Sequence, residues 1–223
     1  MSPIGIFGGT FDPIHYGHLR SAFELLQALS LSEVRFVPSG DPPHRGHTFA
    51  SAELRYRMVE AAVSGQAGFV VDDLELRRDG PSYTIDTLSL YRQEHGDSSL
   101  CLIVGMDAYR GLTSWHRWDE ILDFAHIIIA HRPGWKLPDT GELGKLLAQN
   151  GTDDIEKLRT EPCGRVYNHA VTQLEIASTE IRTQIAAGRD PRFLMPDSVR
   201  DIIVESGCYL KGESNLISGE NYA

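Results

Sequence analysis

Short apolar runs alternate with segments of helical periodicity along most of the chain. The apolar runs predict five strands, which lie at 4–7, 34–37, 69–71, 100–104 and 127–130. Between these runs, apolar residues recur every three or four positions, which is the spacing of an amphipathic helix. Strands that alternate with helices form βαβ units and a parallel sheet, because a parallel pair needs a long crossover connection. The pattern therefore predicts an α/β fold with a Rossmann-like, doubly wound parallel sheet.

The helices follow from the same periodicity and from residues that commonly begin or end a helix. We expect a first helix from His18 to about Leu31, and further helices that begin at Ser51, Ser82, Ser178 and Pro196. Shorter helical segments are expected at 121–122 and 143–147. Residues 74–76 are predicted to be extended, and strand character returns at 166–167 and 171–176.

At 223 residues, the chain is long enough for one large domain with an insertion. We expect the main domain at 1–190 and, within it, a peripheral insertion at 135–162, where the apolar pattern weakens. A small C-terminal helical part is expected at 191–211. Residues 212–223 include few apolar side chains, and we expect them to form a disordered tail.

The strand order predicts where a ligand binds. With the order 3-2-1-4-5, the first and fourth strands are neighbours at the point where the winding of the sheet reverses. Ligands of such sheets bind at this point, outside the carboxyl ends of the strands. The first strand ends in Gly8 and Gly9, and the fourth ends in Gly105, Met106 and Asp107. We therefore expect the ligand between these two turns.

The first glycine turn has the features of a phosphate cradle. A strand, the pair Gly8-Gly9 and a helix N-terminus together direct backbone N–H groups at an anion, and the helix dipole favours a phosphate there. Glycine also lets a ligand approach the backbone, because it has no Cβ. His15 and His18 are placed where that phosphate would lie, which makes the site reactive. The alternatives are a plain glycine turn beside incidental histidines, and a zinc site, for which a third ligand is not defined.

Composition restricts the possible partners and the compartment. The net charge of −10 argues against binding of a nucleic-acid polymer, which needs a basic patch, but not against a nucleotide. No stretch approaches the roughly 20 apolar residues that span a membrane. The N-terminus has no basic leader, and Cys101, Cys163 and Cys208 are odd in number and widely spaced. We therefore expect a cytoplasmic protein with reduced thiols and no membrane partner.

Two motifs resemble those of the nucleotidylyltransferase superfamily. The stretch 8–18 reads Gly-Gly-Thr-Phe-Asp-Pro-x-His-x-Gly-His and resembles the phosphate-binding signature of that superfamily. The stretch 176–182 is similar to its Ile-Ser-Ser-Thr-x-Ile-Arg motif, with Ala177 in place of the first serine. Resemblance to the bacterial nicotinate-mononucleotide adenylyltransferases extends to four further patches, at 42–45, 81–84, 113–118 and 132–134.

The resemblance implies a reaction and its reactants. ATP transfers its adenylyl group to nicotinate mononucleotide by direct in-line attack, which gives deamido-NAD and pyrophosphate in NAD biosynthesis. Mg²⁺ is expected to arrive with the ATP phosphates, without metal ligands from the protein. Two alternatives stay open: an adenylyltransferase for another phosphate acceptor, nicotinamide mononucleotide or phosphopantetheine, and a non-catalytic nucleotide sensor.

The resemblance also implies roles for individual residues. His15 and His18 are the candidate catalytic residues, and they are expected to stabilise charge, because the attacking phosphate oxygen is already ionised and needs no strong base. ATP is expected to contact the two motifs and the turn after the fourth strand, at Gly8, Gly9, Thr10, Phe11, His15, His18, Gly105, Asp107, Ser178, Thr179 and Arg182. Nicotinate mononucleotide is expected to contact His44, Arg45, Tyr83, Thr84, Trp115 and Arg132.

Several of these residues have a second interpretation. Asp107 is also suited to cap the short helix that follows it, and Trp115 to pack in the core. Arg45 and His44 lie in a polar loop, where a solvated side chain is the alternative. Trp118, beside Ile121 and Leu122, is interpreted as a core residue.

The helix that begins near Ser82 bears on the choice between nicotinate mononucleotide, an acid, and nicotinamide mononucleotide, an amide. Backbone N–H groups near Tyr83 and Thr84 are free to donate, and the positive end of the helix dipole favours a carboxylate over a carboxamide. Asp86 is an opposing charge in the same turn. We expect it to face outward, because Ile85 and Leu88 define the buried face.

Overall fold

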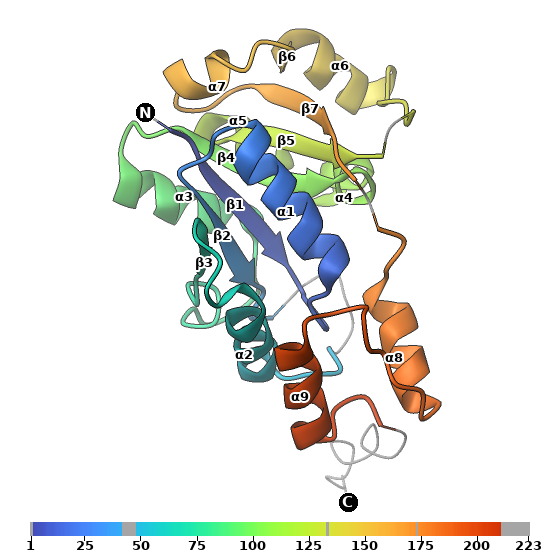
Figure 1. The fold of residues 1–223 in the computed structure, drawn as a ribbon. Helices are drawn as coiled ribbons and strands as arrows, with labels where there is room; N and C mark the ends of the chain where they lie inside the picture. The colour runs from blue at the N-terminus through green and yellow to red at the C-terminus, as the bar shows by residue number, and fades with distance from the viewer. Residues whose placement is uncertain (1, 42–47, 133, 173, 211–223) are drawn as a thin grey trace, which may run out of the picture.

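The computed structural model describes residues 2–41, 48–132, 134–172 and 174–210, and these form a layered α/β structure (Figure 1). Seven parallel strands in these residues make one sheet, in the order β3-β2-β1-β4-β5-β7-β6. The strands are β1 (Ile4–Gly9), β2 (Glu33–Pro38), β3 (Phe69–Val71), β4 (Leu100–Gly105), β5 (His126–His131), β6 (Gly151–Thr152) and β7 (Val166–Ala170). The predicted doubly wound sheet and its 3-2-1-4-5 order are confirmed.

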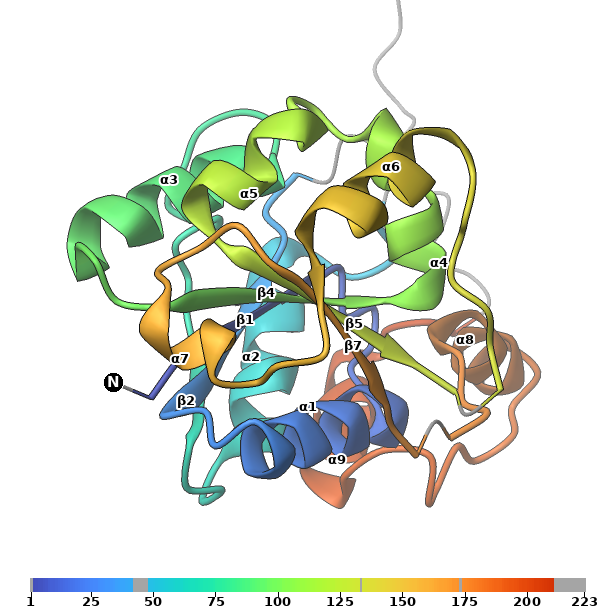
Figure 2. The ribbon, with the colours of Figure 1, turned by 90° about the horizontal axis from the view of Figure 1, so that it is seen from above.

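Helices lie on both sides of the sheet (Figure 2). One side holds α1 (Tyr16–Ala28), α2 (Ala52–Val63), α7 (Lys157–Thr160), α8 (Ser178–Ala186) and α9 (Asp197–Ser206). The other side holds α3 (Thr84–His95), α4 (Met106–Arg110), α5 (Ile121–Phe124), α6 (Gly141–Asn150) and the 3₁₀ turns η1 (Leu112–Ser114) and η2 (Trp118–Glu120).

Two hydrophobic clusters, one on each side of the sheet, form the core. The strand β4 divides its side chains between them, since Cys101 and Ile103 belong to one cluster and Leu102 and Val104 to the other. Successive strand side chains point to opposite faces, so a strand covered on both sides is apolar at every position. In the register of the central strands, Ile4 of β1 lies opposite the first residue of β4. The carboxyl ends of these two strands therefore lie side by side.

Local signals set the ends of the helices. The hydroxyl of Ser51 accepts a 3.2 Å hydrogen bond from Leu54 N, so the predicted start of α2 is confirmed. The helix α1 runs from Tyr16 to Ala28 rather than from His18 to about Leu31. It ends early because Ser30 adopts a left-handed φ of 50°, which breaks the helical path.

Two stretches that were predicted to be extended are not strands. Residues 74–76 form a turn, because the Asp72 carboxylate accepts a 3.0 Å hydrogen bond from Leu74 N and reverses the chain. β7 ends at Ala170, and the residues described at 171–176 lie outside it. Val171 and Ile176 pack in the core, so burial rather than strand pairing explains their apolar character.

The less regular parts of the chain also contain secondary structure. Residues 135–162, expected as a peripheral insertion, include α6, β6 and α7, and β6 pairs with β7 at one end of the sheet. The helix α9 lies within the expected C-terminal helical part, and the tail at 212–223 lies outside the described residues. Cys101, Cys163 and Cys208 form no disulfide. In the described part of the chain, no helix combines the length and apolar character required to cross a bilayer.

Candidate active site

A cavity of about 720 Å³ opens at the carboxyl ends of β1 and β4. Small-molecule sites commonly have about 300–1,000 Å³. The expected site residues that line it are Gly8, Gly9, Thr10, Phe11, His15, His18, Gly105, Asp107, Ser178, Thr179, Tyr83, Thr84, Trp115 and Arg132. Arg182 is not in the cavity wall, and His44 and Arg45 lie outside the described residues. The strand order and the glycine turns thus predicted a cavity that the structure contains.

The glycines of the site fall into two groups. Apart from its chain neighbours, a Cβ on Gly8 or on Gly105 would meet no atom of the described residues within 4 Å, so both backbones face open space in this part of the cavity wall. A Cβ on Gly9 would lie 2.9 Å from the Phe11 ring, and one on Gly17 would lie 3.0 Å from the His15 ring. Gly8 and Gly105 therefore leave room for a ligand, whereas Gly9 and Gly17 leave room for the protein's own aromatic rings.

The two candidate catalytic histidines stack on one another. Their ring centroids are 3.8 Å apart and their planes differ by 28°. The ring of His18 also meets that of Phe11 edge-on, at a centroid distance of 5.2 Å. Burial lowers the pKa of His15 to about 4, so this imidazole is neutral at pH 7. Its Nδ1 is buried and makes no hydrogen bond to the described residues. One neutral donor ring and its stacked partner thus face the glycine turn.

The turn at Asp12 is held by a network that the sequence did not reveal. The buried Asp12 carboxylate accepts hydrogen bonds from Phe49 N at 2.9 Å and from Ala50 N at 3.2 Å. Arg55 of α2 is fully buried and donates to Thr10 O at 2.8 Å and to Gly40 O, which follows β2, at 3.1 Å. The arginine therefore fixes the loops after β1 and β2 relative to each other.

A signal for Arg55 was present in the sequence. It precedes Met58 and Val59 by three and four positions, so it lies on the buried face of the predicted helix. A charged residue in an apolar stripe needs partners, because burying an isolated charge is costly. Burial lowers the pKa of Arg55, and the Asp12 charge opposes that shift.

The motif at 176–182 packs against the same turn. The hydroxyl of Ser178 donates to Pro13 O at 3.0 Å, and Ala177, without a capping side chain, is the N-cap of α8. The helix α8 begins at Ser178, as predicted, but the Ser178 hydroxyl bonds to another segment and does not cap the helix. Arg182 donates to Asp12 O at 2.7 Å and lies over the Phe49 ring at 4.5 Å. These contacts place its guanidinium behind the turn rather than in the cavity wall.

The N-terminus of α3 forms another part of the wall. No side chain among the described residues caps this helix, and Tyr83 and Thr84 line the cavity. Asp86 is not in the cavity wall and pairs with Arg78 at 2.9 Å, so the expectation that it faces away from the site is confirmed. Arg132, at the end of β5, pairs with Glu175 at 2.5 Å while lining the cavity.

The two tryptophans and Asp107 differ in their surroundings. Trp115 is half-buried, packs against the core and also lines the cavity, so the core interpretation is confirmed and its contact with the mononucleotide stays a prediction. Trp118 packs against the same core and does not line the cavity, as expected. Asp107 is exposed in the first turn of α4, and Gly105 rather than Asp107 is the N-cap of that helix.

Further lining residues were not predicted from the sequence. They include Glu75, Thr87, His116 and Trp135. The ring of His116 lies 4.4 Å from that of Tyr83, and the guanidinium of Arg110 lies 4.9 Å from the Trp135 ring. Among the described residues, no group of three or more His, Cys, Asp or Glu side chains is placed to hold a metal ion.

Comparison with known proteins agrees with this geometry. The fold and its cavity are typical of a nucleotide-binding α/β protein. The sequence model of the cytidylyltransferase-like family matches residues 6–184. A relative from Aeromonas hydrophila subsp. hydrophila, named "probable nicotinate-nucleotide adenylyltransferase", is 47% identical over 207 residues, which cover 93% of this chain and 97% of the relative. One of the same name from Methylococcus capsulatus is 45% identical over 209 residues, covering 93% of this chain and all of the relative. The protein belongs to the nicotinate-nucleotide adenylyltransferase family.

Solved structures share the fold. The nicotinic acid mononucleotide adenylyltransferase of Plasmodium falciparum complexed with NaAD superimposes with a TM-score of 0.69 at 20% sequence identity. The match covers 94% of this chain and 98% of that one. The same protein complexed with APC gives a TM-score of 0.68 at 19% identity, with the same coverage. At this level of identity, the likeness supports the Rossmann-like architecture.

Proposed function

We propose that the protein transfers the adenylyl group of ATP to nicotinate mononucleotide, which gives deamido-NAD and pyrophosphate. Family membership supports this activity, because curated relatives over nearly the full length carry the corresponding name. The single observation that carries the site assignment is the pair of open glycines, Gly8 and Gly105, beside the stacked His15 and His18. Backbone without a Cβ, next to two imidazoles, suits the phosphates of a nucleotide.

The reaction needs charge stabilisation more than base catalysis. A phosphate oxygen of the mononucleotide forms a bond to the α-phosphorus of ATP, and the bond from that phosphorus to the bridging oxygen breaks. The electron pair of the broken bond leaves with pyrophosphate. Because the nucleophile is already ionised, His15 and His18 would act as donors to the phosphate oxygens as negative charge shifts onto them. A neutral His15 can still donate through one N–H.

The remaining assigned residues divide between the two substrates. ATP would lie along the turns at Gly8 and Gly105 and the start of α8, where Ser178 and Thr179 line the cavity. The mononucleotide would lie toward Trp115 and the start of α3. An indole face stacks well on an electron-poor pyridinium ring.

Selection of the acid over the amide would come from the N-terminus of α3. The uncapped N–H groups near Tyr83 and Thr84 can donate to both oxygens of a carboxylate. The amide nitrogen of nicotinamide would place a donor against these donors. A buried polar group left unpaired in this way costs about 1–3 kcal/mol. Asp86 points away from the cavity, so its charge does not oppose the positive helix end there.

Mg²⁺ is proposed to enter with the ATP phosphates. An ion of this kind is usually bound through substrate phosphates, one or two carboxylates and waters rather than by an all-protein cage. Asp107, exposed in the cavity wall, is the candidate for a water of that ion or for the adenosine ribose. We also propose a cytoplasmic location, where NAD biosynthesis has access to ATP.

Pyrophosphate release from ATP tests the proposed function. The purified protein is incubated with ATP and Mg²⁺ and, in separate reactions, with nicotinate mononucleotide, nicotinamide mononucleotide or phosphopantetheine. We expect rapid release with the first acceptor and formation of deamido-NAD. Faster release with phosphopantetheine would assign a different acceptor, and no release with any of them would indicate a nucleotide sensor.

A further inference from the structure

The buried carboxyl group of Glu75 lies in the cavity wall and has no role in the reaction as described above. Only 8% of this residue is exposed, and it lines the cavity with Ser82, Tyr83 and Thr87. A carboxylate removed from water costs free energy unless another group compensates it. A buried acid at a substrate cavity is therefore a candidate for recognition of charge.

Its hydrogen bonds place Glu75 beneath the start of α3. The hydroxyl of Thr87, in the first turn of that helix, donates to Glu75 Oε1 at 2.7 Å. The hydroxyl oxygen of Ser82 accepts a hydrogen bond from Gly40 N at 3.0 Å, which leaves its hydrogen for another acceptor. Hydrogen bonds from Ser82 and Thr87 both lower the pKa of Glu75. The carboxyl group is thus next to the segment proposed to bind the nicotinate carboxylate.

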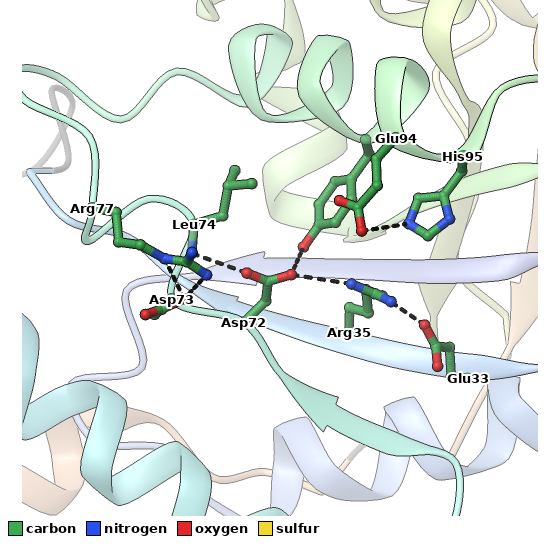
Figure 3. Close-up of polar contacts among 9 residues, drawn as sticks. Glu33, Arg35, Asp72, Asp73, Leu74, Arg77, Glu94 and His95 are labelled. Atoms are coloured by element: carbon green, nitrogen blue, oxygen red, sulfur yellow. Dashed lines mark hydrogen bonds and ion pairs between the residues drawn. The ribbon is translucent and has the colours of Figure 1, made fainter.

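The turn that carries Glu75 is fixed by Asp72 (Figure 3). One Asp72 oxygen accepts from Leu74 N at 3.0 Å, one residue before Glu75. The other oxygen accepts from Tyr91 of α3 at 2.8 Å and from Arg35 of β2 at 3.2 Å. The turn is therefore tied to both the sheet and the helix. Such anchoring holds the Glu75 side chain in place before a ligand arrives.

Among the described residues, the charge of Glu75 has no close cationic partner. Burial is the largest influence on its pKa and raises it, while Arg78 and Arg55 lower it by smaller amounts. Arg78 is engaged with Asp86, and Arg55 with the backbone oxygens of the loops after β1 and β2. Within the described ranges, neither guanidinium lies within ion-pair distance of Glu75. A ligand that brings a positive charge would stabilise the ionised carboxylate.

We propose that Glu75 recognises the positive charge of the pyridinium ring of the acceptor mononucleotide. This inference rests on the proposed function. The oxidised ring carries its charge on a quaternary nitrogen, which has no hydrogen to donate, so only the charge itself can be recognised. The cavity would then be bipolar, with the N-terminus of α3 facing the nicotinate carboxylate and Glu75 facing the cationic ring. Glu75 would be a specificity-determining residue that favours oxidised pyridine mononucleotides over neutral acceptors.

The test compares Glu75→Gln with the parent protein on two acceptors. Glutamine keeps an oxygen that accepts from Thr87 but removes the charge. The acceptors are nicotinate mononucleotide and its 1,4-dihydro form, which has the same carboxylate, ribose and phosphate but a neutral ring. We expect the KM of Glu75→Gln for the oxidised acceptor to rise about tenfold, equivalent to about 1.4 kcal/mol. The KM for the dihydro acceptor and for ATP should change less than about twofold, because neither carries a cationic ring.

The matched control is Asp86→Asn. It removes one negative charge from the first turn of α3, which also holds Thr87, but Asp86 does not line the cavity. We expect this variant to leave both acceptor KM values unchanged. An equal rise for both acceptors in Glu75→Gln would show a structural role and overturn the proposal, as would no rise for either.

A second comparison does not depend on the folding of Glu75→Gln. Glu75→Asp keeps the charge and should retain a preference for the oxidised acceptor. Equal KM values of the parent protein for the oxidised and dihydro acceptors would also overturn the proposal. These outcomes are distinct from failure of the proposed function, which would appear as no pyrophosphate release with any acceptor.

Discussion

The hydroxyl of Tyr209, close to the end of the described chain, donates a 2.7 Å hydrogen bond to Oδ1 of Asp12 in the turn after β1. The bond joins positions 197 residues apart in the sequence, and both residues are buried. The same carboxylate accepts from Phe49 N and Ala50 N. The C-terminal residues after α9 are therefore part of the scaffold of the candidate site.

Tyr209→Phe should weaken both stability and turnover. It removes the shorter of two hydrogen bonds to Oδ1 of the buried Asp12 and leaves only the 3.2 Å bond from Ala50 N, at a cost of about 1–3 kcal/mol of unfolding free energy. Because Asp12 positions the turn between Gly9 and His15, we also expect kcat to fall about tenfold, the scale on which a misplaced catalytic group acts. Urea unfolding and steady-state kinetics measure the two effects. Loss of stability with unchanged kcat would restrict Tyr209 to anchoring the C-terminal segment.

Gly8→Ala should separate ligand binding from folding. Beyond its chain neighbours, a Cβ at this position meets no atom of the described segments within 4 Å, so the thermal midpoint should stay within a few degrees of the parent. If the ATP phosphates lie against this backbone, the methyl group would displace them, and we expect the KM for ATP to rise about tenfold or more. Unchanged kinetics would move the phosphate site away from Gly8.

The control for that variant is Gly5→Ala in the middle of β1. Its Cβ would lie 2.9 Å from a methyl carbon of Leu31 and 3.0 Å from one of Ile103, on the core side of the strand. Overpacking of this kind typically costs about 1–3 kcal/mol. We therefore expect the opposite behaviour, a loss of stability with little change in the KM for ATP.

Burial of His15 predicts a pH dependence of stability. Burial lowers the pKa of His15 in the folded protein to about 4, below the usual histidine value of 6.5. As pH falls from 6.5 toward 4, the unfolded chain binds a proton at this residue that the folded chain does not, so stability declines over that window. The full effect is of the order of 3 kcal/mol. The unfolding free energy is measured at pH 7.5 and at pH 4.5, and the decrease between them should be smaller in His15→Gln than in the parent. An equal decrease in both proteins would contradict the low pKa of His15.

His18→Ala should reduce turnover while the protein stays folded. Loss of one donor to a developing charge typically lowers kcat about 10²–10³-fold. The His18 ring contacts those of His15 and Phe11, so a modest loss of stability should accompany the effect. Steady-state kinetics and a thermal melt measure both quantities. A folded variant with nearly parental kcat would remove His18 from the catalytic role.

The sheet could be predicted because its strands are buried on both faces. β4 and β5 appear as continuous apolar runs, and the observed β1 to β5 exceed the five predicted strands by at most two residues each. The location of the site could be predicted from the same pattern, because the glycine turns lie at the carboxyl ends of the two strands that are neighbours where the winding reverses. The turn at 74–76 could not be predicted from the apolar pattern, because the Asp72 side chain reverses the chain there.

The contacts that hold the site could not be predicted, because they join distant segments. Arg55 bonds to Thr10 O across 45 positions, and Arg182 bonds to Asp12 O across 170. Periodicity indicates that such side chains face inward but not which oxygen they meet. Glu75 was missed for a related reason, since its burial depends on the turn that Asp72 makes and on Thr87 of α3.

The most direct test of the central claim compares nicotinate mononucleotide with nicotinamide mononucleotide at fixed ATP. In the proposed complex, the carboxylate of nicotinate mononucleotide lies against uncapped N–H groups at the start of α3, near Tyr83 and Thr84. An unpaired amide donor there costs about 1–3 kcal/mol, and about 1.4 kcal/mol corresponds to a factor of ten, so kcat/KM should favour nicotinate mononucleotide by about tenfold or more. Equal values, or a preference for nicotinamide mononucleotide, would contradict it.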